Sequence, residues 1–423
     1  MELKIRNIGR VEKADILIQG ITVVAGANGT GKSTVSKSLY SILEISDNSL
    51  AKAQVERTRS LRSSIVEWRR RNIPVSKIPI QQFIKKIEEI GLETDGRQET
   101  FAYEITGFLK GSVPEKFWDD QRMKKEIQQL YITYNEIAGT GWEYYLEYVS
   151  QLVLNDVFQE QINCLNNDGD GSIYYKDGDT STKIGILKHR IQEMKIDFGP
   201  GVGQPVYITT PDLMDSVGTY GKLYSAERGG TISYANAQLS RLLMEKKDSR
   251  YLVAEEYNRI EEQKEQLQGV LQEVLEGEIY LENDRIAYHD RWCDSSIELS
   301  NISSGMKIFL ILQSLVTNGI FLERTCLIID EPETNLHPDW QLKLAHLLVL
   351  LNKKLGILIY LNSHSPYFVR AIEFYSNQHQ ILGECNFYIM KKNNATGMYQ
   401  SECVTEHLGI IYDEMAEPFN KIM

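Results

Sequence analysis

The chain has 423 residues, of which 42% are hydrophobic and 25% charged, and its formal net charge is −12. This composition is typical of a globular protein, and the length allows two or three domains. The acidic balance argues against a protein that binds nucleic acid over its whole surface, although a local basic patch is compatible with it. No apolar run reaches the roughly 18 residues of a membrane span, no signal-peptide core is present, and the five cysteines form no CxxC pair. We expect a cytoplasmic protein with reduced thiols and no membrane contact.

The N-terminal segment predicts two strands followed by a phosphate-binding loop. Residues 2–8 and 14–24 have strand patterns, "GANGTGKST" (26–34) matches G-x-x-x-x-G-K-[ST], and a helix is predicted from about residue 32 to 43. The glycines let the backbone fold tightly, so that its N–H groups face phosphates, and the helix N-terminus adds partial positive charge. An ordinary glycine turn is the alternative, and the complete pattern between a strand and a helix disfavours it.

The same loop supplies side chains for ATP and Mg²⁺. Lys32 is expected to neutralise the β- and γ-phosphates, and the Ser33 hydroxyl is expected to ligate Mg²⁺. We predict that seven residues of the loop bind the nucleotide: Gly26, Asn28, Gly29, Gly31, Lys32, Ser33 and Thr34.

Residues 46–163 predict a mostly helical insertion, because glycine and proline are sparse and apolar residues recur at helical spacing. The insertion contains a basic stretch, "RTRSLRSSIVEWRRRNIPVSK" (57–77), in which Glu67 is the single acid. Contact with nucleic-acid phosphates, contact with a partner protein and a solvated helix face are all compatible with this stretch. Its cations are Arg57, Arg59, Arg62, Arg69, Arg70, Arg71 and Lys77.

The remaining chain predicts an α/β fold. Residues 164–234 contain short strands that end with "PVYIT", and residues 235–276 are helical, favouring one amphipathic helix over a coiled coil. "GEIYLENDRIAYHD" predicts a hairpin at the start of residues 277–423, and helices alternate with strands after residue 300. This alternation indicates a parallel sheet. Residues 1–45, 164–234 and 277–423 would together form the ATPase lobe.

Two acids and a histidine follow apolar strands in the final third. "TCLIIDEPE" (325–333) ends a predicted strand at Asp330 and Glu331, and "YLNSHSP" (360–366) ends the next one near His364. The carboxyl ends of parallel strands meet at one edge of a sheet. Asp330 would hold Mg²⁺, Glu331 would polarise the attacking water, and His364 would contact the γ-phosphate. The alternatives are two acids at a solvent edge and a structural histidine.

A further anion-binding turn lies at the start of a predicted helix, in "ISSGMK" (302–307). Ser303 offers a hydroxyl and Gly305 allows close backbone approach. If two chains pack head to tail, this turn would close on the γ-phosphate bound by the partner chain. Taken alone, Ser303 would be interpreted as a simple N-cap.

With these four motifs in order, the chain resembles the ABC-type ATPases of the SMC/Rad50/RecF group, and within it the OLD-family and PtuA-like ATPases of anti-phage systems. The resemblance rests on "NIGRVEKADILIQGITVVAGANGTGKST", "NISSGMKIFLILQSL", "LIIDEPETNLHPDWQ" and "LNSHSP", which cover under a quarter of the chain. It implies an ABC-type P-loop ATPase head with a mixed or parallel sheet and a mostly helical insertion.

The resemblance carries over to single residues. Lys32 and Ser33 match the Walker A pair, Asp330 and Glu331 match Walker B and its catalytic glutamate, and His364 matches the switch histidine. The segment 333–337, which includes Asn335, matches the D-loop, and Ser303, Ser304 and Gly305 match the signature motif. The usual Leu-Ser-Gly-Gly-Gln signature is here Ile-Ser-Ser-Gly-Met. Gln204 and the end of "YITTPD" are weak candidates for the Q-loop.

The resemblance also implies a biological role. It points to a homodimer that closes around ATP and regulates a separate HNH-type nuclease in prokaryotic anti-phage defence. Because 59 residues follow His364 and contain no metal-binding acid cluster, we expect no nuclease domain in the chain. A RecF- or Rad50-like DNA-binding ATPase of DNA repair is the alternative, and an ATPase that signals through a protein, as in a toxin–antitoxin pair, is a third. The phage trigger, the type of nucleic acid and any higher oligomer stay open.

Overall fold

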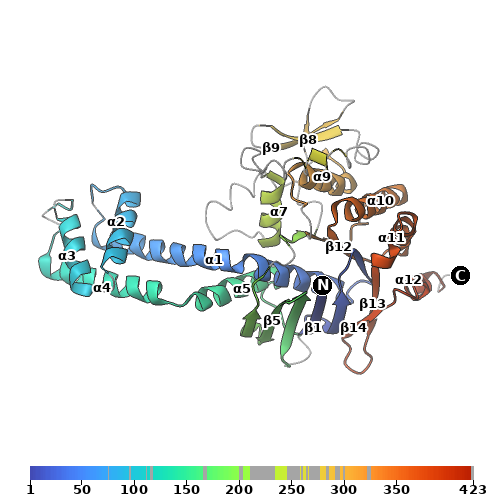
Figure 1. The fold of residues 1–423 in the computed structure, drawn as a ribbon, viewed down its shortest axis with the longest axis horizontal. Coiled ribbons are helices and arrows are strands. Elements are labelled where there is room, and N and C mark those ends of the chain that lie inside the picture. The colour runs from blue at the N-terminus through green and yellow to red at the C-terminus, as the bar shows by residue number, and fades with distance from the viewer. Residues whose placement is uncertain are drawn as a thin grey trace. The chain divides into compact units, whose positions relative to one another are not determined.

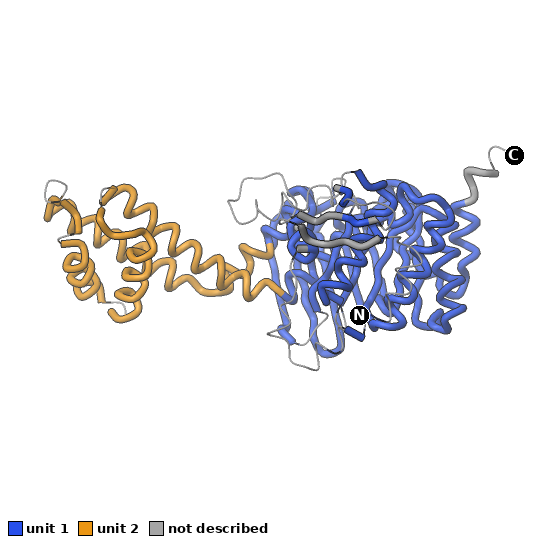
Figure 2. Tube along the Cα trace, turned by 90° about the horizontal axis from the view of Figure 1, so that it is seen from above, with its two compact units in different colours: residues 1–47, 151–423 blue, residues 48–150 orange. Residues whose placement is uncertain are grey.

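The computed structural model divides the chain into two compact units (Figure 2). The head comprises Met1–Asp47 and Gln151–Met423, and the insertion comprises Asn48–Ser150. Helices α1 (Lys32–Asn72) and α5 (Trp142–Phe158) belong to both. The residues described are 1–74, 76–94, 97–110, 112–114, 118–164, 169–199, 203–209, 234–244, 258, 261–262, 265, 277–282, 285–290, 296–298, 301–321 and 325–420.

The described part of the head is built on an 11-stranded mixed sheet, in the order β6-β5-β4-β1-β2-β14-β13-β3-β12-β11-β7 (Figure 1). Strands β13, β3, β12, β11 and β7 run parallel to one another, whereas neighbouring strands in the run β6, β5, β4, β1 and β2 are antiparallel. The predicted α/β fold is therefore confirmed. The strands are β1 (Glu2–Ile8), β2 (Val11–Leu17), β3 (Ile21–Ala25), β4 (Gly171–Asp177), β5 (Thr180–Leu187), β6 (Arg190–Ile196), β7 (Val206–Ile208), β11 (Cys326–Asp330), β12 (Leu358–Ser363), β13 (Asn386–Lys392) and β14 (Tyr399–Cys403).

The central strands are buried on both faces, which explains their continuous apolar runs. Ile21 and Val23 of β3 enter one core with helices α9, α10 and α11, whereas Val24 enters a second core with the first turns of α1. None of the described helices is both long enough and apolar enough to cross a membrane. The head helices are α7 (Tyr234–Met244), α9 (Ser304–Thr317), α10 (Pro338–Leu355), α11 (Pro366–Gln378) and α12 (Gly409–Asn420), with a 3₁₀ turn at Leu382–Glu384.

The predicted hairpin is confirmed. Strands β8 (Gly277–Glu282) and β9 (Arg285–Asp290) pair antiparallel, and β10 (Ile297–Glu298) adds a third strand to this small sheet. In the C-terminal segment, β13 and β14 pair antiparallel inside the main sheet and are followed by α12. The predicted helical segment 235–276 is described mainly in α7, and most of its remainder lies outside the described residues.

The insertion contains the second part of α1, helices α2 (Ile80–Glu93), α3 (Gln98–Leu109) and α4 (Asp120–Gly139), and the first part of α5. It has its own apolar core, in which Phe101 contacts the rings of Tyr131 and Tyr134 at centroid distances of 5.3 and 5.9 Å. The prediction that the first helix ends near residue 43 was wrong. No glycine or proline interrupts residues 32–72, so nothing in the local sequence ends α1.

The compact insertion is narrower than the predicted range of 46–163. The difference lies mostly in the second half of α5, where Val153, Leu154 and Val157 join the core of the head. Composition changes along the chain did not reveal this boundary, because one helix contributes to two separate cores.

We expect Phe101→Ala to destabilise the insertion by about 3–5 kcal/mol, because it empties the centre of an aromatic cluster. Phe101 is fully buried, whereas Tyr103 on the same helix is 78% exposed, so Tyr103→Ala is a matched control that should change the stability by less than about 0.5 kcal/mol. Hydrogen–deuterium exchange would measure the effect on α3 and α4. Equal protection in the two variants would contradict this account of the core.

Candidate nucleotide-binding site

The phosphate-binding loop connects β3 to α1. Its glycines have positive φ angles of 151° (Gly26), 78° (Gly29) and 90° (Gly31), values that other residues adopt only with strain. A Cβ atom at Gly31 would also lie 2.9 Å from the side chain of Val11. Glycine is therefore required here for two reasons, the backbone conformation and the packing of the loop against β2.

The loop presents unsatisfied donors and a buried cation. Within the described part of the chain, the N–H groups of Asn28, Gly29 and Gly31 donate no backbone hydrogen bond. Lys32 is 4% exposed, and its Nζ donates to the carbonyls of Gly26 (2.8 Å) and Ala27 (2.9 Å). Burial lowers the pKa of Lys32, while the carboxylates of Glu331, Glu333 and Asp330 act to raise it. Free amides around a desolvated ammonium fit a bound polyphosphate.

Asp330 ends β11 inside a network of hydroxyl and amide donors. Tyr207 Oη donates to Asp330 Oδ2 (2.8 Å), and Asn362 Nδ2 donates to Asp330 Oδ1 (2.6 Å) and to Ser36 Oγ (3.1 Å). Burial raises the pKa of Asp330, and hydrogen bonds from Ser36, Tyr207, Asn362 and Ser33 oppose that shift. The network holds the carboxylate in one orientation at the carboxyl edge of the sheet.

The residues fit Mg²⁺, which prefers oxygen ligands and retains several waters. The Ser33 hydroxyl is one of the groups that act to lower the pKa of Asp330, so a hydroxyl and a carboxylate converge beside the loop. No cluster of three or more His, Cys, Asp or Glu that could hold a metal ion occurs among the described residues. Phosphate oxygens and water would therefore complete the coordination shell.

Glu331 and His364 lie together at the same sheet edge, because β11 and β12 are parallel neighbours. His364 Nδ1 is 3.7 Å from Glu331 Oε1. Glu331 adopts the left-handed conformation (φ 48°), and its N–H donates to the Asn362 carbonyl (3.0 Å). This strained backbone directs the residue away from the strand and toward the site.

Glu333 is a site residue to which sequence analysis assigned no separate role. Its Oε1 accepts hydrogen bonds from Ser363 Oγ (2.7 Å), His364 N (2.8 Å) and Ser365 N (3.1 Å), and it lies 3.3 Å from His364 Nδ1. The Glu333 side chain is only 3% exposed. One buried carboxylate therefore fastens the loop that carries His364 to the segment after β11.

The predicted signature turn lies at the start of α9, and within the described chain no hydrogen bond or ion pair connects Ser303, Ser304 or Gly305 to the phosphate-binding loop. Ser303 is the N-cap, yet its side chain makes no capping hydrogen bond, so the simple N-cap interpretation lacks its defining contact. A Cβ atom at Gly305 would lie 2.9 Å from the carbonyl oxygen of Asn335. Gly305 therefore packs against the D-loop segment of its own chain, where Asn335 has a φ of 62°.

Other residues of the site also carried no clear sequence signal. Tyr207 lies on β7, whose pairing with β11 is a long-range contact. Arg10 Nη1 donates to the Gly29 carbonyl (2.9 Å) from the turn between β1 and β2. Gln204 precedes β7, and β7 runs parallel to β11, so Gln204 lies toward the edge opposite Asp330. Gln204 is therefore a poor Q-loop candidate.

We expect Tyr207→Phe to raise the Mg²⁺ concentration needed for half-maximal ATP hydrolysis by roughly 10- to 100-fold, because Asp330 loses an orienting donor. A Mg²⁺ titration of hydrolysis would measure this shift. Tyr388→Phe is the matched control, since Tyr388 Oη accepts from Leu17 N (2.9 Å) instead of contacting Asp330. Identical titrations for both variants would contradict the orienting role of Tyr207.

The raised pKa of Asp330 predicts a pH-dependent stability difference from Asp330→Asn in nucleotide-free protein. The folded protein keeps the carboxyl proton at pH values where the unfolded chain has lost it, so wild-type stability falls as pH rises above 3.8. The variant should therefore gain relative stability above that pH, and the gain should level off once the folded carboxyl ionises. Chemical denaturation at several pH values measures it, and a pH-independent difference would contradict the burial argument.

Comparison with solved structures gives distant likenesses. The SMC head domain from Thermotoga maritima has 10% identity and a TM-score of 0.39, covering 95% of this chain and 98% of that chain. An Smc head bound to the C-winged helix domain of ScpA has 10% identity and a TM-score of 0.42, covering 97% and 98%. An ATP-binding cassette of an ABC transporter, in its ADP conformation, has 12% identity and a TM-score of 0.33, covering 98% and 96%. All three TM-scores are below 0.5, so no assignment rests on these likenesses.

The family assignment rests on sequence. No curated protein matches the chain, but residues 1–369 match the family described as the AAA ATPase domain. The matched range includes the phosphate-binding loop, Asp330, Glu331 and His364. The chain therefore belongs to the AAA ATPase domain family, whose activity is the binding and hydrolysis of ATP.

Proposed function

We propose that this ATPase is of the ABC type, that it dimerises around ATP, and that it regulates a separate HNH-type nuclease in prokaryotic anti-phage defence. The observation that carries the proposal is the division of the predicted motifs between two places. Ser33, Asp330, Glu331 and His364 converge at one sheet edge, whereas the uncapped Ser303 hydroxyl stands on α9.

Each residue of the converged site has a distinct task in hydrolysis. The amides of the loop and Lys32 bind the phosphates of ATP, and Ser33 and Asp330 hold Mg²⁺, which would screen the phosphate charge. Glu331 accepts a proton from the water that attacks the γ-phosphate, and His364 contacts that phosphate. Glu333 keeps His364 in place through the backbone of its loop.

A second copy would complete the site. Ser303, Ser304 and Gly305 of one chain, together with Asn335, would face the γ-phosphate bound by the other. Support comes from the exposure of Ser303 and Asn335 and from the helix N-terminus that Ser303 precedes, which favours anions. In this arrangement, ATP bridges two copies and its hydrolysis releases them.

The role in defence, with a nuclease activity that comes from a partner, rests on the motif resemblance. The described residues after His364 include α11, β13, β14 and α12, and both strands belong to the sheet of the head. The DNA-repair alternative depends on DNA contacts by the basic stretch, and four of its arginines make hydrogen bonds inside the insertion.

Glu331→Gln is expected to lower ATP turnover by at least about 100-fold while ATP binding persists, because it removes the proton acceptor and keeps the shape of the side chain. In light scattering, the trapped protein should be a dimer in the presence of ATP and Mg²⁺. The Lys32→Ala variant loses phosphate binding, so its mass should not change when ATP is added. Normal turnover in Glu331→Gln would refute the assignment. A trapped, ATP-bound protein that never gains mass on adding ATP would refute the ATP-bridged dimer.

The same variant tests the partner. Tagged Glu331→Gln protein, expressed with its neighbouring genes and captured with ATP and Mg²⁺, should retain a nuclease at a fixed stoichiometry. Recovery of nucleic acid alone, in a salt-sensitive manner, would favour the repair function instead.

A further inference from the structure

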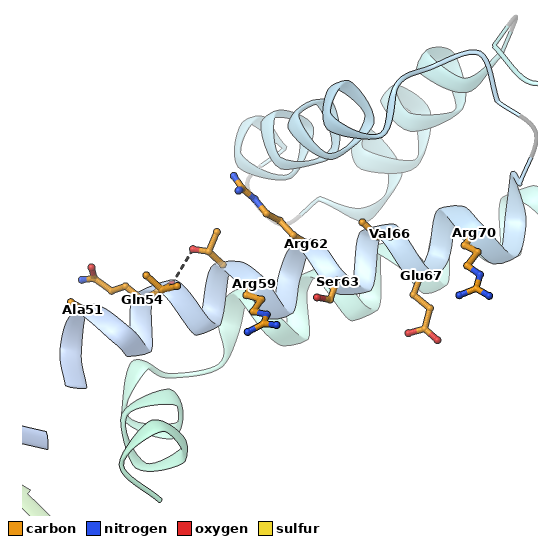
Figure 3. A pocket seen from close by; sticks show the side chains of 10 residues that line it. Ala51, Gln54, Arg59, Arg62, Ser63, Val66, Glu67 and Arg70 are labelled. Carbon is orange, nitrogen blue, oxygen red and sulfur yellow. Dashed lines mark hydrogen bonds between the residues drawn. The ribbon is translucent and has the colours of Figure 1, made fainter. Parts of the chain in front are cut away.

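A hollow of about 990 Å³ runs along one side of α1 in the insertion (Figure 3). Each side chain that lines it is exposed, including Val55, Arg59, Glu67 and Arg70. A small-molecule site needs polar groups held inside a concave, mostly apolar wall. The hollow is therefore an open helix surface. A pair of histidines in the head, which the nucleotide site does not use, has a more specific arrangement.

The histidine pair joins two helices that pack against each other in the head. His346 lies on α10 and His379 is the C-cap of α11, and their Nε2 atoms are 2.9 Å apart. The planes of the two rings differ by 21°, and the ring centroids are 5.1 Å apart. Because the centroids are much farther apart than the Nε2 atoms, the rings meet edge to edge and the two nitrogens point at each other.

An edge-to-edge contact of this kind holds one hydrogen between the two nitrogens. One ring donates through its Nε2–H group, while the other accepts through an unprotonated Nε2. If both rings become imidazolium, both Nε2 atoms carry a hydrogen and both rings are positive, so the bond is lost and the charges repel. The contact therefore exists only while at least one of the two histidines is neutral.

The surroundings of the pair oppose added positive charge. Burial lowers the pKa of His379 from 6.5, and the charges of Lys353 and Lys354 lower it further. Lys353 Nζ donates to the His379 carbonyl (3.0 Å), and the Tyr375 ring stacks on His346 with a centroid distance of 4.6 Å. Because the unfolded chain binds the proton more readily, the neutral pair stabilises the fold above pH 6.5, and this contribution falls as the pH drops below that value.

The carboxylates on α10, α11 and the elements beside them are paired or exposed. On α11, Glu373 pairs with Arg370 (2.6 Å) and accepts a hydrogen bond from Tyr412 Oη (2.5 Å). Exposed carboxylates are screened by water, so they offset the repulsion between two charged rings only weakly. The exposed charged residues at the start of α10, in the 3₁₀ turn and on α12 are Asp339, Lys343, Glu384, Asp413 and Glu414.

Both helices of the pair begin at the nucleotide site. α10 begins directly after the predicted D-loop, and α11 begins two residues after His364. Near these starts, Ser365 Oγ donates to Gln341 Oε1 (3.3 Å) and connects the two segments. The histidine pair connects the same helices farther along. Loss of the pair leaves the contact near the starts as the remaining one of these two, so His364 becomes freer to move relative to the D-loop.

We propose that His346 and His379 form an acid-sensitive clamp between α10 and α11, which opens when both rings are protonated and then slows ATP hydrolysis. The clamp requires neither a second copy nor a nuclease, because both rings belong to one chain. A transition-metal ion is disfavoured at the pair. Two nitrogens that point at each other across 2.9 Å leave no position about 2.0–2.1 Å from both along their lone pairs, and Lys353 and Lys354 add positive charge.

Hydrogen–deuterium exchange of nucleotide-free protein at about pH 7.5 and about pH 5.5, corrected for intrinsic rates, measures the clamp. In the wild type, exchange in α10 and α11 should be roughly tenfold faster at the lower pH, as expected from the loss of one hydrogen bond. His379→Gln should change less than about twofold, because a neutral amide donates to or accepts from His346 at either pH. His407→Gln replaces an exposed histidine after β14 and is the matched control, which should respond like the wild type.

ATP hydrolysis gives a second readout. His364 is present in every variant, so the informative quantity is the ratio of kcat at about pH 7.5 to kcat at about pH 5.5. This ratio should be at least about threefold larger in the wild type and in His407→Gln than in His379→Gln. His346→Gln is the reciprocal variant and should behave like His379→Gln, so the test remains available if one of the two variants does not fold.

The proposal is overturned if wild-type exchange in α10 and α11 is the same at both pH values, or if His379→Gln responds to acid as the wild type does. Calorimetry with Zn²⁺ at neutral pH tests the metal alternative. If the wild type binds one more ion than His379→Gln, the pair is a metal site instead. Lys32→Ala should keep the acid response in exchange, because the clamp needs no nucleotide, and a failure of the ATP-bridged dimer would leave that result unchanged.

Discussion

The burial of the Asp330 carboxylate at the end of a central parallel strand is the constraint on which the site depends. A carboxylate removed from water is costly unless donors surround it. Tyr207 and Asn362 provide those donors directly, and Ser36 connects to Asn362. These residues come from β7, β12 and α1. The parallel register of β7, β11 and β12 must therefore be correct before Asp330, the proposed metal ligand, is held in its orientation.

The second buried carboxylate of the site, Glu333, holds the loop after β12 in place. The loop after β12 exposes backbone N–H groups at the position where His364 must stand. Glu333 Oε1 accepts from two of these groups and from Ser363 Oγ, so one acid satisfies three donors and links two loops. Glu331, in contrast, is partly exposed, and its Oε1 lies 3.7 Å from His364 Nδ1. Glu333 therefore holds the loop in place, and Glu331 is left for its proposed role in catalysis.

The close approach of Gly305 to the Asn335 carbonyl connects the predicted signature turn to the predicted D-loop within one chain. Any side chain at position 305 would displace the backbone of the D-loop, so the usual argument for glycine, close approach to a phosphate, is not the sole reason for it here. A movement of the segment after β11 would be transmitted to the start of α9 by direct packing. The insertion has its own aromatic core, so its stability comes from contacts between its own helices.

The sequence by itself determined the features whose physics is local. The glycines and Lys32 of the phosphate-binding loop, the acids at the end of β11, the hairpin of β8 and β9 and the alternation of helix and strand all depend on residues close together in the chain. Tertiary structure decided the remainder. Tyr207 joins Asp330 because β7 pairs with β11, across more than one hundred residues, and α5 divides between two cores. Several arginines of the basic stretch make hydrogen bonds inside the insertion. The partners of Arg57 and Arg62, which are Ala138 and Glu88, lie on other helices. Such partners are set by packing between distant segments, which no local pattern encodes.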